Sequence, residues 1–442
     1  MKNGQRKYNF SSLIITLICL YLFGVLLFTK DTSWPNLQIL GKNPQQNYKP
    51  LDILEPIIIN NIIDSNPETQ TQTQTEKKEE EKEEEGYQIS STDGCDFSKG
   101  KWVYDNVTMP LYKEEECVFL TAQVTCVRNG RNDTLYQNWR WQPSDCSLPK
   151  FDARVLLEKV RGKRVMFVGD SVNRNQWESM LCLLNSVIPP GRATWTMGAP
   201  LSVFYIQDYN ATFEFYWSPF LVESNSDDSR NHSISQRIIM PKSISKHGNN
   251  WKSADFLVFN TYIWWMNSHS IKVLRESSKQ GLSEYNDVER SLAYERVLTT
   301  WATWLKHNVD HNRTSSFFIS MSPVHQQSSN WNNPAEVACA LETMPILNTS
   351  MAIEMGTDRR LLEVTKKVIN DTEIPVTLID ITALSEYRKD AHTSVYTINK
   401  GKLLTPEQKA DPAKYADCLH WCLPGVPDTW NELLYAHIIS KS

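Results

Sequence analysis

Ser171 is the residue whose type and position most directly indicate chemistry. It ends the segment Gly-Asp-Ser at 169–171, which follows a run at 164–168 that is apolar after Arg164, and it precedes a helical pattern over roughly 172–185. At such a turn a serine hydroxyl is exposed at the sheet edge, and the N–H groups that open the next helix point toward a developing oxyanion. Gly169 permits the tight turn. The alternative is an ordinary helix N-cap, since Asp and Ser are both favoured there.

A serine nucleophile needs a base, and the segment Asp-Cys-Leu-His-Trp-Cys at 417–422 supplies a candidate. Asp417 and His420 lie three residues apart, so on a tight loop the carboxylate can hold the imidazole in one tautomer. Cys418 and Cys422 flank His420, and disulfides there would clamp its loop. Two alternatives stay open: a metal site of Cys418, His420 and Cys422, or an Asp417 that merely caps the next turn.

An apolar run at 13–28 predicts a membrane anchor near the N-terminus. With its flanks the run reaches the ~17–25 residues that a membrane-spanning helix needs. A cleaved signal peptide is the alternative, but no small-x-small cleavage site follows the run. We therefore expect a cytosolic tail at 1–9 and a transmembrane signal anchor at 10–29, with the rest of the chain in the lumen. The orientation follows from the basic residues that precede the run, Lys2, Arg6 and Lys7.

Cysteines and glycosylation sequons agree with a lumenal location. Nine cysteines are present, and all but Cys19 lie beyond the anchor. An even number in an oxidising compartment predicts four disulfides, although eight cysteines allow about 105 pairings. Seven Asn-x-Ser/Thr sequons also follow the anchor, and they predict a glycoprotein of the secretory pathway. They begin at Asn106, Asn132, Asn210, Asn231, Asn312, Asn348 and Asn370.

Composition divides the lumenal part into three regions. Residues 30–92 hold a Thr-Gln repeat and a Glu/Lys block, compositions that predict a disordered stem. That block, Glu76 to Glu85, has seven Glu against three Lys, which accounts for −4 of the formal net charge of −5. The remainder is nearly neutral, which argues against nucleic acid as a partner. Four cysteines and many aromatics predict a small Cys-rich subdomain at 93–147, followed by a larger domain at 148–442.

The larger domain shows an alternation of strand and helix patterns. Helical spacing of apolar residues occurs over 286–308 and again around 361–368. Between the helical patterns lie short apolar runs typical of buried parallel strands. Such alternation predicts a three-layer α/β fold with a mostly parallel sheet, whose ligands bind at the carboxyl ends of the strands. The expected strands are 164–168, 255–259, 316–320 and 375–379.

Gly-Asp-Ser near the start of an α/β domain and Asp-x-x-His near its end resemble the SGNH/GDSL hydrolase superfamily. Over residues 94–442 the chain also resembles the plant trichome-birefringence-like family of Golgi polysaccharide O-acetyltransferases. The motifs that carry this resemblance are Cys-Asp-Phe-Ser-Lys-Gly-Lys-Trp-Val at 95–103, Gly-Asp-Ser-Val-Asn-Arg-Asn-Gln at 169–176, Phe-Asn-Thr-Tyr-Ile-Trp-Trp at 259–265 and Asp-Cys-Leu-His-Trp-Cys-Leu-Pro-Gly at 417–425.

The resemblance implies roles for named residues. Ser171 would carry the acetyl group, His420 would act as base and acid, and Asp417 would orient it. Arg174 and Asn260 would help to bind the oxyanion. No bound cofactor is expected; acetyl-CoA or a derived donor would be a co-substrate, with donor-supply proteins as partners at the Golgi membrane. The resemblance also implies four disulfides: Cys95–Cys146, Cys117–Cys182, Cys126–Cys422 and Cys339–Cys418.

The acceptor is expected to be a wall polysaccharide. Flat aromatic faces suit pyranose rings, so Trp264 and Trp265 are candidates to line an acceptor groove, with His325 and Trp331 at its border; the alternative is that the tryptophans are core residues. The segment Asn-Thr-Tyr-Ile-Trp-Trp at 260–265 is similar to the xylan-acetylating branch. We therefore expect acetylation of O-2 and/or O-3 of xylosyl residues. Alternatives are mannan, xyloglucan or pectin as acceptor, a polysaccharide acetyl-esterase, and a non-catalytic wall-polymer binding protein.

Overall fold

The structure is a computed structural model that describes residues 95–230, 234, 236–275, 285–331, 333, 337–348, 356–373 and 375–440. The expected tail, signal anchor and stem lie outside these residues, as does the sequon at Asn231. Within the described residues, no helix is long and apolar enough to cross a membrane.

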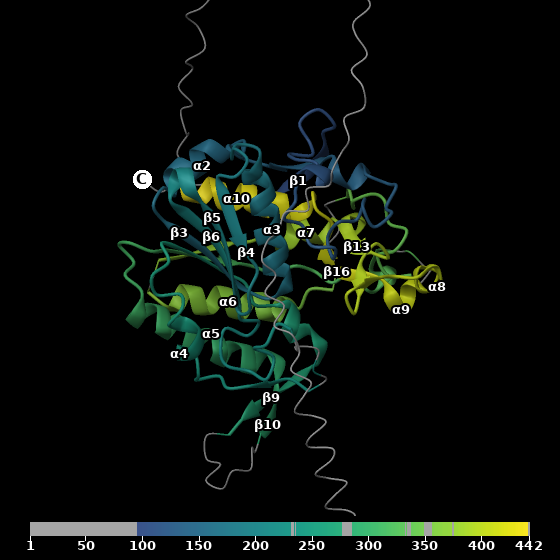
Figure 1. Cartoon of the computed structure of the whole chain (residues 1–442). Helices are drawn as coiled ribbons and strands as arrows, with labels where there is room; N and C mark the ends of the chain where they lie inside the picture. Colours follow the sequence, from purple (N-terminus) through teal and green to yellow (C-terminus); the bar gives the residue numbers. More distant parts are fainter. Residues whose placement is uncertain are drawn as a thin grey trace, which may run out of the picture. The chain divides into compact units, whose positions relative to one another are not determined.

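A seven-stranded sheet forms the centre of the described chain (Figure 1). Its first five strands are parallel, and the last two continue it in antiparallel fashion. The mostly parallel α/β fold expected from the sequence is confirmed, and the four predicted strands are present. Across the sheet the order is β12 (Val376–Ile379), β11 (Ser315–Ile319), β8 (Phe256–Phe259), β3 (Arg164–Gly169), β6 (Ala211–Trp217), β5 (Leu201–Ile206) and β4 (Ala193–Thr196).

The central strands are buried on both faces, as their unbroken apolar runs predict. In β3 every residue after Arg164 is buried, and Val168 lies opposite Phe259 of β8. The sequence did not predict β6, because its run is interrupted by Glu214. That carboxylate is accommodated by an ion pair of 2.7 Å with Arg164 on the neighbouring strand.

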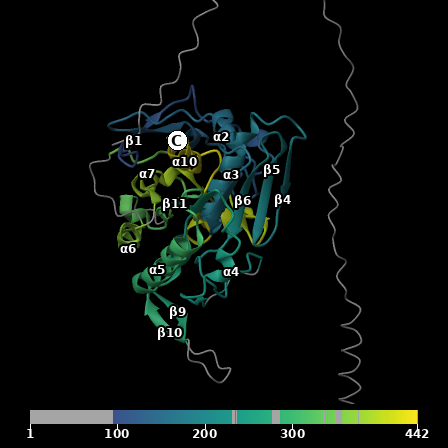
Figure 2. The ribbon, with the colours of Figure 1, turned by 90° about the vertical axis from the view of Figure 1, so that its left-hand side faces the viewer.

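Helices cover both faces of the sheet (Figures 1 and 2). On one face α10 (Val426–Ser440) packs against α2 (Ala153–Lys159) and α3 (Ser171–Asn185), and on the other α5 (Arg290–Asn308) packs against α6 (Arg359–Asp371). The helix expected from residue 286 begins only at Arg290, because β10 (Tyr285–Glu289) pairs with β9 (Ser270–Leu274), which also pairs with β7 (Ile238–Ile239). Short helices are α4 (Ser245–Gly248), α7 (Thr382–Glu386), α8 (Pro406–Lys409) and α9 (Pro412–Tyr415).

Residues 95–147 belong to the same compact unit as the rest of the described chain. Their one strand pair is β1 (Gly100–Tyr104) with β2 (Trp139–Pro143), where Trp102 lies opposite Trp141. The region is anchored by long-range hydrogen bonds, such as that from the Trp102 indole to the Leu384 carbonyl at 2.8 Å.

The four disulfides join the pairs that the family resemblance implied. Cys95–Cys146 lies within the N-terminal region, and Cys117–Cys182 joins that region to α3. The other two, Cys126–Cys422 and Cys339–Cys418, hold the two ends of the segment that contains His420. That segment is β16 (Asp417–Trp421), which pairs with β13 (His392–Ser394) near the small hairpin of β14 (Ile398–Asn399) and β15 (Lys402–Leu403).

Candidate active site

Ser171 is the first residue of α3, and only Asp170 separates it from the end of β3. Asp170 caps the helix by accepting a hydrogen bond of 2.9 Å from the Val172 N–H. Residue 169 must be glycine for a reason other than its φ angle: a Cβ atom there would lie 2.3 Å from the Asn260 carbonyl oxygen. The close approach of the β3 and β8 ends therefore depends on Gly169, and it leaves the Ser171 hydroxyl partly exposed at the sheet edge.

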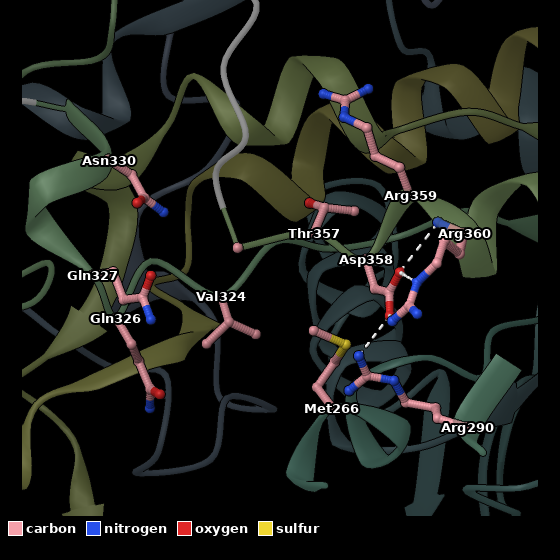
Figure 3. A pocket seen from close by; sticks show the side chains of 11 residues that line it. Met266, Arg290, Val324, Gln326, Gln327, Asn330, Thr357, Asp358, Arg359 and Arg360 are labelled. Atoms are coloured by element: carbon pink, nitrogen blue, oxygen red, sulfur yellow. Dashed lines mark hydrogen bonds and ion pairs between the residues drawn. The ribbon is translucent and has the colours of Figure 1, made fainter. Parts of the chain in front are cut away.

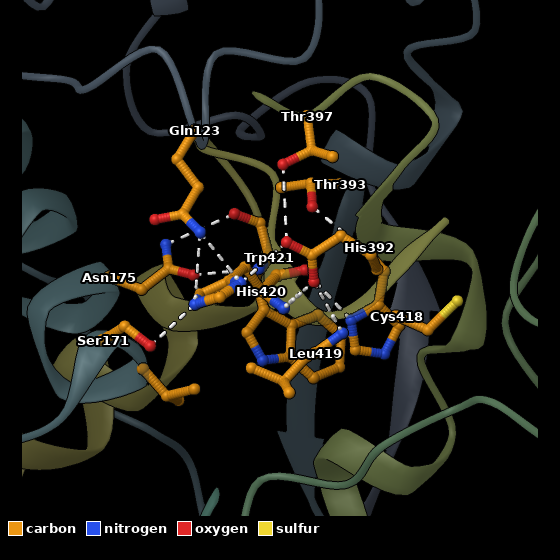
Figure 4. Close-up of polar contacts among 12 residues, drawn as sticks. Gln123, Ser171, Asn175, His392, Thr393, Thr397, Cys418, Leu419, His420 and Trp421 are labelled. Carbon is orange, nitrogen blue, oxygen red and sulfur yellow. Dashed lines mark hydrogen bonds and ion pairs between the residues drawn. The ribbon is translucent and has the colours of Figure 1, made fainter. Parts of the chain in front are cut away.

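Ser171, His420 and Asp417 are joined in a hydrogen-bonded series, of which Figure 4 labels Ser171 and His420. The Ser171 Oγ atom lies 2.7 Å from His420 Nε2, and His420 Nδ1 lies 2.7 Å from Asp417 Oδ2. A carboxylate only accepts hydrogen bonds, so Nδ1 carries the proton and Nε2 presents its lone pair to the serine. This is the geometry of a serine nucleophile with its base and orienting acid.

Backbone contacts hold the Asp417 carboxylate in place. Its Oδ1 atom accepts hydrogen bonds from the N–H groups of Leu419 at 3.1 Å and His420 at 3.0 Å. Burial by itself would raise the pKa of Asp417. The attraction of the His420 ring when it is protonated, together with the hydrogen bonds from that ring and from the two backbone N–H groups, outweighs burial and holds this pKa well below its usual range. The carboxylate therefore stays ionised and fixes the imidazole tautomer.

The side chain of Asn175 docks β16 onto α3. Its Oδ1 atom accepts a hydrogen bond of 2.8 Å from the Trp421 N–H, and its Nδ2 atom donates to the Trp421 carbonyl at 3.3 Å. Asn175 lies one helical turn after Ser171 and Trp421 directly follows His420. This pairing sets the distance between nucleophile and base. Asn175 stands within the longer motif at 169–176, but nothing in that motif predicts its contact with Trp421.

Gln123, from the N-terminal region, completes the surroundings of His420. Its Nε2 atom lies 3.1 Å from His420 Nδ1 and 3.3 Å from Nε2, while its Oε1 atom accepts a hydrogen bond of 2.8 Å from Arg174. Arg174 is also 3.5 Å from the buried carboxylate of Glu178, one turn further along α3. Sequence reasoning identified Arg174 and missed Gln123, which no motif marks.

Asn260 does not point at the nucleophile in this structure. Its Nδ2 group donates to the carbonyls of Ile319 at 3.1 Å and Ser320 at 3.0 Å, and the residue is buried at the end of β8. Both amide hydrogens are thus used to tie β8 to the end of β11. The expected oxyanion role for Asn260 therefore does not match the position of its side chain.

Trp264 and Trp265 are core residues, so neither offers an open face to a sugar. Their exposed fractions are 6% and 2%. The Trp265 indole donates to Thr261 Oγ1 at 2.9 Å, and the Trp264 ring packs edge-on against Trp217. The guanidinium of Arg237 lies over the Trp264 ring, 3.8 Å from its centre. The two tryptophans therefore do not line a groove, and the alternative, that they are core residues, describes them instead.

His325 is fully buried rather than at the border of a groove. It packs against the segment that contains His420. Its backbone N–H donates to the Cys418 carbonyl at 3.1 Å, and its ring Nδ1 atom lies 2.6 Å from His392 Nε2. His392 in turn places Nδ1 at 3.1 Å from the His420 carbonyl and stacks on Trp421 at 3.9 Å. Burial lowers the pKa of His325 to about 4. Trp331 is half-buried, and its indole donates to Glu342 at 2.7 Å.

The metal alternative at Cys418, His420 and Cys422 does not fit the structure. Both cysteines are in disulfides and present no thiolate. The described part of the chain contains no other group of His, Cys, Asp and Glu arranged to hold a metal ion.

Comparison with known proteins found two family matches and several close relatives. Residues 148–437 match a GDSL/SGNH-like acyl-esterase family found in Pmr5 and Cas1p, and residues 93–147 match the PMR5 N-terminal domain. Xylan O-acetyltransferase 6 of Oryza sativa subsp. japonica is 58% identical over 356 residues, which are 80% of this chain and 64% of that protein.

Two further relatives are covered more completely. Xylan O-acetyltransferase 3 of the same organism is 56% identical over 349 residues, 79% of this chain and 76% of that protein. Protein trichome birefringence-like 31 of Arabidopsis thaliana is 45% identical over 347 residues, 78% of this chain and 83% of that protein. The chain thus spans slightly less than two thirds of the first relative and about three quarters or more of the other two.

Proposed function

The chain belongs to the GDSL/SGNH-like acyl-esterase family found in Pmr5 and Cas1p, and on this premise we propose that it is a xylan O-acetyltransferase. It transfers acetyl groups to O-2 and/or O-3 of xylosyl residues through an acetyl-Ser171 intermediate. The observation that carries the proposal is the Ser171–His420–Asp417 series with its two contacts of 2.7 Å. The names of the rice relatives support xylan as the acceptor.

In the first half-reaction Ser171 Oγ attacks the carbonyl carbon of the acetyl donor, and its proton passes to His420 Nε2. The tetrahedral intermediate collapses as the bond to the donor's leaving group breaks, and the proton on His420 goes to that group. The N–H of Ser171 opens α3 and has no partner among the described residues, so it is available to the oxyanion. Arg174, one turn along the same helix face, supplies a second donor.

In the second half-reaction a sugar hydroxyl replaces the donor. His420 takes the hydroxyl proton as the oxygen attacks the acetyl carbon, and Ser171 Oγ leaves and recovers that proton. Transfer rather than hydrolysis requires the acceptor to be held against the intermediate while water is excluded.

The proposal includes a setting for the enzyme: a single-pass protein of the Golgi membrane with a lumenal catalytic region and N-linked glycans. The basic residues and apolar run at the N-terminus support the anchor, and the four disulfides support an oxidising compartment. The donor is acetyl-CoA or a derived compound, delivered by supply proteins. All six sequon asparagines among the described residues are exposed, as glycan attachment requires: Asn106, Asn132, Asn210, Asn312, Asn348 and Asn370.

An acceptor panel tests the proposal. The protein would be incubated with an acetyl donor and with xylo-, manno- and galacturono-oligosaccharides, and the products located by NMR. We expect new acetyl esters at O-2 or O-3 of xylosyl residues, and none with Ser171→Ala. Transfer only to another polysaccharide would overturn the acceptor, and release of acetate from acetylated xylan without any transfer would identify an acetyl-esterase instead. Full biological activity of Ser171→Ala would favour a non-catalytic binding protein.

A further inference from the structure

A cavity of about 550 Å3 opens at the carboxyl ends of β8 and β11, apart from the triad. One wall carries Gln327 and Asn330, and the opposite wall carries Asp358 and Arg290 (Figure 3). The walls meet at Gly356, whose φ of +70° and close approach exclude other residues: a Cβ atom there would lie 2.1 Å from the Val324 carbonyl oxygen. The volume lies within the range of sites that hold small organic ligands.

The cavity adjoins the segment that holds the catalytic base. Val324 and Gln326 line it, and between them in the chain lies His325, whose N–H donates to the Cys418 carbonyl at 3.1 Å. Cys418 directly follows Asp417. A ligand in the cavity would therefore lie beside the catalytic segment without touching the triad, none of whose residues lines the cavity.

The charges around the cavity are balanced. Arg290 pairs with Asp358 at 2.5 Å, Arg359 with Glu386 at 2.8 Å, and Arg360 with Asp358 at 2.8 Å and Glu289 at 3.7 Å. Each of the three guanidinium groups that line the cavity is thus already paired with a carboxylate, that of Asp358 in the lining itself and those of Glu386 and Glu289 outside it. An anionic ligand would meet no unbalanced positive charge and would have to compete with the carboxylates already bound, so the cavity is suited to a neutral ligand.

The cavity nevertheless offers many hydrogen-bonding groups. The amides of Gln326, Gln327 and Asn330 are exposed and have no side-chain partner within the described part of the chain, and each can both donate and accept. Arg290, only 6% exposed, keeps its Nε–H without a partner among the same residues. Met266 supplies apolar surface. Mixed donors and acceptors beside an apolar patch match a sugar, whose hydroxyls need both and whose C–H faces are apolar.

We propose that this cavity binds a neutral sugar residue of the acceptor chain, at a distance from the hydroxyl that is acetylated. This inference rests on the proposed function and adds a second point of contact for the acceptor. Binding there would hold a long acceptor against acetyl-Ser171, whereas a short acceptor would reach only the triad. Affinity should therefore rise with chain length, and the rise should depend on the cavity.

The test measures binding by calorimetry to the Ser171→Ala chain, which cannot turn over. Unacetylated xylo-oligosaccharides from xylobiose to xylohexaose would be compared between this parent and a variant that also carries Gln326→Ala, Gln327→Ala and Asn330→Ala. Three lost hydrogen bonds should weaken xylohexaose binding roughly ten- to hundredfold and leave xylobiose binding unchanged. The control substitution is Gln142→Ala, an exposed glutamine on β2.

Two further measurements separate the possible failures. In the Ser171-containing chain the triple variant should raise KM for xylohexaose while kcat for xylobiose stays constant, which shows that the triad is intact. Equal xylohexaose affinity in parent and triple variant, or binding that collapses at high salt as an anion site would, overturns the inference. Cavity-dependent binding of manno- but not xylo-oligosaccharides would keep the inference and overturn xylan as the acceptor. If the parent binds no neutral oligosaccharide at all, both the cavity inference and xylan as the acceptor are overturned.

Discussion

The Oε1 atom of Gln123 accepts a 2.8 Å hydrogen bond from the guanidinium of Arg174. Because arginine only donates, this contact orients the Gln123 amide and turns its NH2 group toward the His420 ring. One residue of the N-terminal region thus connects the base to the arginine proposed to bind the oxyanion. The catalytic geometry therefore depends on both sequence regions.

Replacing Gln123 should impair catalysis more than stability. In Gln123→Ala the charged Arg174 loses a hydrogen bond, and such bonds contribute about 1.5–3 kcal/mol. If the whole of this is lost from the stabilisation of the transition state, the rate of transfer should fall roughly 10- to 150-fold. Gln123→Glu should instead place a carboxylate beside His420, favour the imidazolium, and move the acid limb of the pH–rate profile to higher pH. Steady-state transfer rates across pH check both. A profile unmoved in Gln123→Glu would show that Gln123 only packs there; Gln142→Ala is the control.

The three triad residues should act as one unit. Ser171→Ala, His420→Ala and Asp417→Asn should each reduce transfer by about 10⁴-fold or more, and Ser171→Ala combined with His420→Ala should be no worse than either alone. Circular dichroism would establish that the variants fold. Additive losses in the double variant, or detection of normal turnover in Ser171→Ala, would contradict a covalent mechanism through these residues.

The disulfide Cys339–Cys418 should matter for catalysis as well as for stability. It closes a loop of 79 residues, and its removal by paired Ser substitutions should lower the free energy of unfolding by about 2–4 kcal/mol. Because Cys418 directly follows Asp417, the disulfide also fixes the position of that carboxylate, and kcat should fall when the disulfide is removed. The matched control is Cys95–Cys146, which closes a loop of 51 residues away from the triad. Its removal should lower the free energy of unfolding and leave kcat unchanged. Denaturant unfolding and kcat, measured on both variants, separate the two effects; equal kcat values would rule out a clamping role.

The buried His325 should make the fold sensitive to acid. Burial lowers its pKa from 6.5 to about 4, so between these values the unfolded chain binds a proton that the folded chain does not. The free energy of unfolding should therefore decrease as pH falls from about 6.5 toward 4, by up to about 1.4 kcal/mol per pH unit from this group. His325→Gln should flatten that dependence, and His307→Gln, at an exposed site on α5, should not. Parallel curves for His325→Gln and the parent protein would refute the prediction.

Local patterns were sufficient to predict the main strands, the start of α3 and the triad. The run at 165–168 is apolar throughout because both faces of β3 are covered, and the Gly-Asp-Ser turn follows from a cap and a close backbone approach at Gly169. Asp417 and His420 are close in sequence, so their pairing needed only a short segment. The strands, the turn and the Asp417–His420 pair are local features, and local chemistry leaves a pattern in the sequence. The contact between Ser171 and His420 spans 249 residues, and it was expected from the chemistry of a serine nucleophile and from the family resemblance.

Residues brought together from distant parts of the chain could not be assigned in this way. Trp264 and Trp265 resemble a sugar platform in sequence, yet their rings fill the space between β6, α5 and the end of β8. Asn260 stands where an oxyanion donor was expected, but the neighbouring carbonyls at the end of β11 occupy its amide. Composition gives the same signal for a buried and an exposed aromatic ring, because only packing decides which it is.

The sequence by itself therefore determined the candidate nucleophile, base and acid of the proposed mechanism, together with the α/β framework that presents them. Only the tertiary structure decided what surrounds Ser171: Gln123 from the N-terminal region, Asn175 docking β16, and His325 beneath the catalytic segment. Each of these contacts joins residues far apart along the chain. Their positions follow from how the sheet, the helices and the disulfides pack, which no local pattern encodes.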